Sequence, residues 1–109
     1  AHITGGGLLE NIPRVLPAGL AAELDAGAWE LPPVFRWLQH HGHIASSELA
    51  RTFNCGIGMI AVTNPDETEA TIGILEAGGE TVYRIGRIVP RGADMPGCVV
   101  ANLGAQWPG

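Results

Sequence analysis

The first 17 residues, AHITGGGLLENIPRVLP, decide how the chain begins to fold. Residues 1–3 are apolar and typical of a short strand, and Thr4 leads into three glycines at Gly5, Gly6 and Gly7. Residues 8–16 predict a helix, which Pro13 should kink or interrupt because proline lacks an amide donor. Glycines let the backbone adopt positive φ, and the first amides of a helix have no partner within it. The segment therefore predicts a glycine loop that can bind a phosphate.

This loop lacks the features of two common phosphate-binding motifs. No Gly-Lys-Ser/Thr follows it, and its spacing is not the G-x-G-x-x-G of dinucleotide-binding proteins. A tight strand-to-helix turn without a ligand is therefore an open alternative. Asn11 and Arg14 lie one helical turn apart, so both can face the loop. Arg14 favours the binding hypothesis, because a guanidinium can contact a phosphate through two hydrogen bonds.

A second glycine-containing turn lies in residues 51–59, RTFNCGIGM. Gly56 and Gly58 permit close approach of another backbone, so this turn can meet the first loop. Cys55 has no Lys, nearby His or helix N-terminus in the sequence that would lower its pKa. We therefore expect Cys55 to be a small buried residue, with a role as a nucleophile as the alternative.

Composition limits the class of protein. The 109 residues are enough for one domain, and 46% hydrophobic with 16% charged residues is typical of a globular chain. A net charge of −5 argues against a general nucleic-acid surface, and no apolar run reaches membrane-spanning length. Cys55 and Cys98 make no disulfide framework, which favours reduced thiols and a cytoplasmic location. The histidines at 40, 41 and 43 lack further ligands at metal-binding spacing, so we expect no metal site.

The order of expected elements indicates an α+β fold with helices packed on a mixed sheet. We expect strands at 1–3, 21–25, 57–62, 81–89 and 98–103, with a bulge at Gly86. Besides 8–16, helices are expected from the prolines at 32–33 to Gly42, from the serines at 46–47 to about 54, and from 64 to 78. Trp37 is expected in the core, Trp29 packed at its rim and Trp107 outside it. The domain would cover 1–103 and a tail 104–109, disordered from residue 106.

Two of these segments resemble one enzyme family. AHITGGG followed by ENIPRVLP, together with RTFNCGIGM, is similar to the C-terminal part of phosphoribosylformylglycinamidine cyclo-ligase, also called AIR synthetase. The similarity continues more weakly to about Val100, so it covers nearly all of this chain but part of the family protein. It implies an α+β domain with partial likeness to a ferredoxin-type sandwich. An N-terminal domain and the beginning of the C-terminal domain would lie outside this sequence.

The resemblance implies an ATP-dependent ring closure in de novo purine biosynthesis. ATP phosphorylates the formyl oxygen of formylglycinamidine ribonucleotide, an amidine nitrogen attacks, and phosphate leaves to give aminoimidazole ribonucleotide. ATP and Mg²⁺ would be held mainly by the N-terminal domain, which is also a partner of this domain. The full-length protein would be a cytoplasmic homodimer that binds no nucleic acid or membrane. This chain alone would be inactive, with apolar surface exposed where the other domain is absent.

The resemblance also assigns roles to residues of the two glycine turns. His2 is a candidate for proton transfer, with an orienting or core role as the alternative. Substrate or phosphate would be bound by a set from both turns: Thr4, Gly5, Gly6, Gly7, Asn11, Arg14, Asn54, Gly56 and Gly58. Two other readings stay open. One is a non-catalytic α+β module that binds an anion or nucleotide, and the other is a related ATP-using enzyme such as selenophosphate synthetase. The ENIPRVLP and RTFNCGIGM segments favour the cyclo-ligase.

Overall fold

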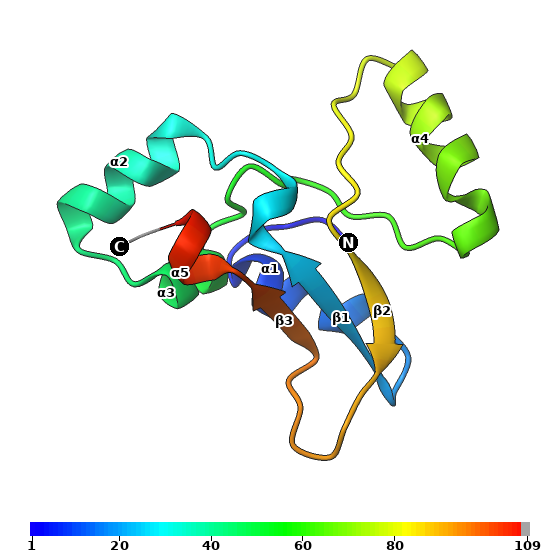
Figure 1. The fold of residues 1–109 in the computed structure, drawn as a ribbon, viewed down its shortest axis with the longest axis horizontal. Helices are drawn as coiled ribbons and strands as arrows, with labels where there is room; N and C mark the ends of the chain where they lie inside the picture. The colour runs from blue at the N-terminus through cyan, green and yellow to red at the C-terminus, as the bar shows by residue number, and fades with distance from the viewer. Residues whose placement is uncertain (108–109) are drawn as a thin grey trace.

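The computed structural model of the chain describes residues 1–107, with a small three-stranded sheet at its centre (Figure 1). The middle strand is β1 (Leu20–Asp25), flanked by β2 (Gly86–Pro90) and β3 (Cys98–Ala101). β1 pairs antiparallel with β2, with Ala22 opposite Ile88, and parallel with β3, with Ala22 opposite Cys98. The mixed sheet expected from the sequence is confirmed.

Helices complete the α+β architecture. The α-helices are α1 (Gly7–Asn11), α2 (Pro33–Gly42), α3 (Ser46–Thr52), α4 (Thr68–Ala77) and α5 (Leu103–Gln106). Short 3-10 turns are η1 (Pro13–Val15), η2 (Ala26–Ala28) and η3 (Pro65–Glu67). Pro13 divides the helix expected at 8–16, because α1 ends before it and η1 begins at it. None of the described helices is long and apolar enough to cross a membrane.

The core lies between the sheet, α1 and α3 and extends to the C-terminal helix. Its largest side chains with no more than 1% exposure are Leu8, Ile12, Leu31, Leu49, Cys55 and Trp107. Trp29 and Trp107 contact each other edge to face, with ring centroids 5.6 Å apart. The Trp29 indole N–H donates a hydrogen bond of 3.0 Å to the carbonyl of Cys55. Trp29 thereby links the turn at Cys55 to the core, where it packs against Trp107.

Several expected strands are shorter than predicted or absent. In the segments 1–3 and 57–62 the pairing recorded by the structure is a single antiparallel bridge between His2 and Met59. β2 starts at Gly86, so this glycine begins the strand and is no interior bulge. A Cβ at Gly86 would overlap the carbonyl of Glu23, which explains why this strand begins with glycine. The strand predicted at 98–103 ends at Ala101, where the chain turns into α5.

The predictions for two tryptophans were wrong. Trp37 was expected in the core, yet it is 58% exposed and stacks on His41. α2 instead buries Gln39, whose side-chain amide donates 3.1 Å to the carbonyl of Trp107. Trp107 was expected outside the core but is 1% exposed, and Gln106 belongs to α5, so the tail is ordered at both residues. The rest of the predicted tail, 108–109, lies outside the described residues.

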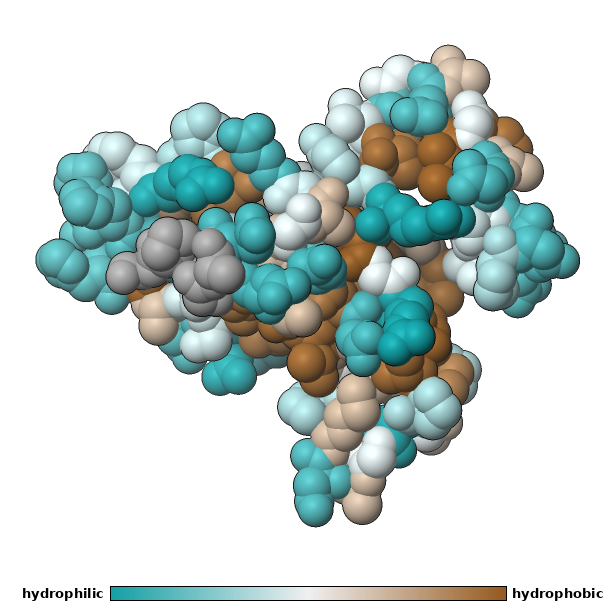
Figure 2. Space-filling view, viewed as in Figure 1, coloured by the Kyte–Doolittle hydropathy of each residue, from teal (hydrophilic) through white to brown (hydrophobic). Residues whose placement is uncertain are grey.

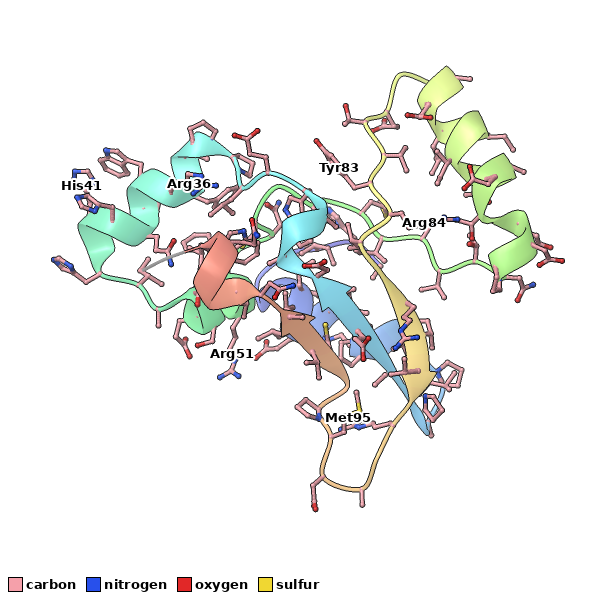
Figure 3. The ribbon with its side chains drawn as sticks, viewed as in Figure 1. Arg36, His41, Arg51, Tyr83, Arg84 and Met95 are labelled. Atoms are coloured by element: carbon pink, nitrogen blue, oxygen red, sulfur yellow. The ribbon has the colours of Figure 1, made fainter. Side chains whose placement is uncertain are left out.

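Helix α4 stands apart from the rest of the domain (Figure 1). Two connecting segments, 60–67 and 78–85, join it to the body, and none of its residues is buried. Ile74 is 73% exposed and Leu75 38%, and Figure 2 shows hydrophobic surface over this helix. An ion pair of 3.1 Å links Arg84 to Glu69 and ties the helix to its own connecting segment (Figure 3).

Candidate functional site

The glycine loop has one open position and two crowded ones. Gly6 and Gly7 have φ of 96° and 59°, a conformation that favours glycine. A Cβ at Gly7 would overlap the carbonyl oxygens of Ala50 and Phe53 in and beside α3. A Cβ at Gly5, by contrast, would have no atom within 4 Å. Gly7 is therefore required by packing, whereas the fold itself leaves the space at Gly5 free.

Asn11 lies behind this loop and is 5% exposed. Its side-chain N–H₂ donates to three loop carbonyls, at 2.8 Å to Gly7, 3.2 Å to Thr4 and 3.3 Å to Gly5. Its side-chain oxygen accepts from the Thr4 hydroxyl at 3.4 Å and from Nη1 of Arg14 at 3.1 Å. Asn11 thus faces the loop from the protein side and Arg14 bonds to Asn11, while the binding roles expected of both stay predictions.

The two glycine turns meet, as their composition predicted. The amide of Ile3 donates 2.9 Å to the carbonyl of Gly58, and the His2–Met59 bridge adjoins this bond. In the second turn the side-chain oxygen of Asn54 accepts 2.9 Å from the amide of Gly56. Cys55 and Gly56 have φ of 56° and 95°, so the turn doubles back sharply toward the first loop.

A hollow of about 220 Å³ lies where the turns meet. It brings Thr4 of the first turn together with Asn54 of the second, which are two of the predicted site residues. Its remaining wall was not predicted and consists of Ile3, Phe35, Thr52 and Phe53. The rings of Phe35 and Phe53 are 5.9 Å apart, one from α2 and the other directly after α3. No sequence motif marks these two rings as bordering a site, because they meet only through tertiary packing.

Other predicted site residues lie outside this hollow. His2 is exposed, and within residues 1–107 no hydrogen bond involves its imidazole. Arg14 is exposed apart from its bond to Asn11, while Gly58 is exposed on the second turn. The hollow's lining likewise excludes Gly5, Gly6, Gly7, Asn11 and Gly56. The roles of all the predicted site residues, including Thr4 and Asn54, stay predictions.

The thiols and the histidine cluster have ordinary structural surroundings. Burial raises the pKa of Cys55 to about 12 and that of Cys98 to about 11, so both thiols are neutral at pH 7. His41 forms a hydrogen bond of 3.0 Å with the carbonyl of Trp37. Among the described residues no group of three His, Cys, Asp or Glu side chains could hold a metal ion.

A second hollow, of about 410 Å³, lies beside the paired tryptophans and was not predicted. Trp29 and Trp107 line it together with Arg36 and Tyr83, which Figure 3 labels. It shares no residue with the hollow between the glycine turns, so the two are separate surfaces.

Comparison with known proteins identifies the family. A family model described as "AIR synthase related protein, C-terminal domain" matches residues 1–95. Phosphoribosylformylglycinamidine cyclo-ligase of Methylobacillus flagellatus is 55% identical over 93 residues, which cover 85% of this chain and 27% of that protein. The enzyme of that name from Paraburkholderia xenovorans is 60% identical over 88 residues, covering 81% and 25% respectively. The chain thus spans about a quarter of the length of these curated relatives. It belongs to the AIR synthase related protein family, within that family's C-terminal domain.

Proposed function

We propose that this chain is the C-terminal part of a phosphoribosylformylglycinamidine cyclo-ligase. The full-length protein would use ATP to close formylglycinamidine ribonucleotide to aminoimidazole ribonucleotide, a step of purine biosynthesis. One structural observation supports the proposal in addition to the similarity to named relatives. The two segments with the strongest resemblance, far apart in sequence, meet around one hollow that holds Thr4 and Asn54. A shared surface is what a substrate-binding wall requires.

The proposed residues fall into two walls of a substrate cleft. On the first, the amides of Gly5 and Gly6, the Thr4 hydroxyl and the Arg14 guanidinium would hold a phosphate or amide of the substrate. On the second, Asn54 would lie with the exposed backbone at Gly56 and Gly58. Gly7 and Asn11 would support the first wall without contacting the substrate. Gly7 packs against α3, and the Asn11 side-chain amide is already hydrogen-bonded to the loop.

The chemistry sets what these walls must do. A formyl oxygen is a poor leaving group, and transfer of a phosphoryl group from ATP makes it a good one. The protein then has to position the amidine nitrogen against the activated carbon and to neutralise phosphate charge. His2, at the edge of the first wall, would take up or release a proton, since an imidazole can both accept and donate one.

ATP and Mg²⁺ would be held mainly by the N-terminal domain of the full-length protein. Mg²⁺ in such sites needs carboxylate ligands. The described residues contain no suitable cluster, so this chain's donor set does not fit the metal.

We further propose that the full-length protein is a cytoplasmic homodimer. The net charge of −5 supports the absence of a nucleic-acid surface.

A chimera tests the proposal. This chain would replace the matching C-terminal quarter of the Paraburkholderia xenovorans cyclo-ligase, to which it is 60% identical over 88 residues. We expect ATP-dependent formation of aminoimidazole ribonucleotide from formylglycinamidine ribonucleotide, and none from the 109-residue chain alone. The unaltered parent enzyme is the control. A chimera that melts cooperatively and binds ATP, yet forms no product, would contradict the proposal.

A further inference from the structure

We propose that Asn11 is a positioning residue that aims the amides of the glycine loop and the guanidinium of Arg14, and that it does not touch the substrate. The inference rests on the proposed function for what the loop binds. Its geometric part, the ordering of the loop and of Arg14, stands on the structure by itself.

The first step is that the Asn11 side chain has no capacity left for a ligand. A primary amide offers two N–H donors and an oxygen with two lone pairs. Here the nitrogen lies within hydrogen-bonding distance of three carbonyls, and the oxygen accepts from two donors. The residue is also 5% exposed. Contact with a substrate would require breaking these bonds.

The second step follows from the planarity of the peptide. In a trans peptide the N–H of one residue points opposite to the C=O of the residue before it, and the structure has no cis peptide among its described bonds. The carbonyls of Thr4, Gly5 and Gly7 all turn toward Asn11. The amides that follow them, those of Gly5, Gly6 and Leu8, must therefore turn away from it. Leu8 is fully buried, so the donors that one side chain directs to the open side of the loop are the amides of Gly5 and Gly6.

The third step concerns Arg14. Its Nη1 donates 3.1 Å to the Asn11 oxygen, while the rest of its side chain is exposed. The residue lies in η1 directly after Pro13, whose ring restricts the backbone there. A long cation that would otherwise sample many rotamers is held next to the loop, with its remaining N–H groups available. Asn11 therefore couples the two kinds of donor that the first wall would present to an anion.

Two variants separate the two halves of this role. Asn11→Ala removes every bond, whereas Asn11→Asp loses the donors to the loop and keeps an acceptor for Arg14. Asn64→Ala is the matched control, since that exposed asparagine makes no capping bond. The measurements on the 109-residue chain are ¹⁵N relaxation of loop amides and the side-chain ¹⁵N signal of Arg14.

We expect order parameters at Gly5, Gly6 and Leu8 to fall from about 0.85 to below about 0.6 in both Asn11 variants, and to stay unchanged in the control. The hydrogen bond to Asn11 should separate the side-chain ¹⁵N signal of Arg14 from those of the other arginines. This separation should be lost in Asn11→Ala and kept in Asn11→Asp. If neither variant folds, hydrogen exchange in the unsubstituted chain still tests whether the Asn11 side chain is bonded to the loop. Its Asn11 side-chain N–H₂ should be protected from hydrogen exchange, and free exchange there would overturn the inference.

In the chimera, Asn11→Ala should raise KM for formylglycinamidine ribonucleotide about tenfold while kcat changes less than about threefold, the pattern of lost uniform binding. The positioning role is overturned if Asn11→Ala leaves the order parameters of the loop amides unchanged. It is also overturned if these order parameters fall while KM in an active chimera stays the same. An inactive unsubstituted chimera speaks against the proposed function instead. The order parameters and the Arg14 signal then still decide whether Asn11 fixes the loop.

Discussion

Gly7 is the position where a single methyl group would do most damage to the glycine loop. Its φ is positive, and a Cβ would overlap two carbonyl oxygens near α3. We expect Gly7→Ala to lower the free energy of unfolding by at least about 2 kcal/mol, through overpacking and backbone strain. Gly5→Ala, with open space around its Cβ, should change it by less than about 0.5 kcal/mol. Urea unfolding of both variants checks the pair, and equal losses would contradict the packing argument.

The two cysteines give a prediction with a definite pH range. Burial raises the pKa of Cys55 to about 12 and of Cys98 to about 11, both above the ordinary thiol value. A raised folded-state pKa means that the neutral thiols contribute stability fully below the unfolded-state pKa, and that this contribution is lost as pH rises through the folded values. We therefore expect the free energy of unfolding to fall between about pH 9 and pH 12. Replacing both cysteines with alanine should flatten the decline, and an unchanged slope would contradict it.

At the scale of the element, α2 shows that a helical pattern does not by itself tell which face is buried. Trp37 is exposed, whereas Trp29, just before α2, is buried and bonded to the carbonyl of Cys55. We expect Trp29→Phe to cost about 1–3 kcal/mol, because that buried carbonyl loses its donor. Trp37→Phe should cost less than about 0.5 kcal/mol. Thermal melting compares the two, and a larger loss for Trp37→Phe would contradict the observed orientation of α2.

Elements with strong local signals could be predicted from the sequence, and those that depend on distant partners could not. Pro13 divided its helix and β1 formed where alternation indicated, because both signals are local. The segment 57–62 has the composition of a strand, yet the β-pairing recorded for it is one isolated bridge, from Met59 to His2. Gln39 is buried because the carbonyl of Trp107, 68 residues away, accepts its hydrogen bond.

The candidate site shows the same division. The proximity of its two glycine turns could be inferred from composition, since glycines in both permit close approach. The aromatic wall could not, because Phe35 and Phe53 come from different helices and meet through tertiary packing. The inward direction of the Asn11 amide was equally inaccessible, since it depends on where three carbonyls of the loop point.

At the scale of the whole molecule, α4 is the least supported part of the domain. Its ten residues include no buried side chain, and an exposed ion pair such as Arg84–Glu69 adds little stability. Helices of this length are marginal in water without tertiary packing. We expect the amides of α4 to exchange with solvent almost as fast as in an unfolded chain, while those of β1 stay protected. Hydrogen exchange followed by NMR checks this, and equal protection of both elements would contradict it.

The place of β1 in the sheet has a consequence for synthesis on the ribosome. Both of its partners come late: Ala22 lies opposite Ile88 and Cys98, so this strand is made long before either neighbour exists. At about 5–20 residues per second, the central strand waits roughly 3 to 15 s for its first and second partners. During that interval both edges of β1 lack their backbone hydrogen-bond partners. Shielding these edges until residues 98–101 have been made is a task suited to chaperones that bind extended segments.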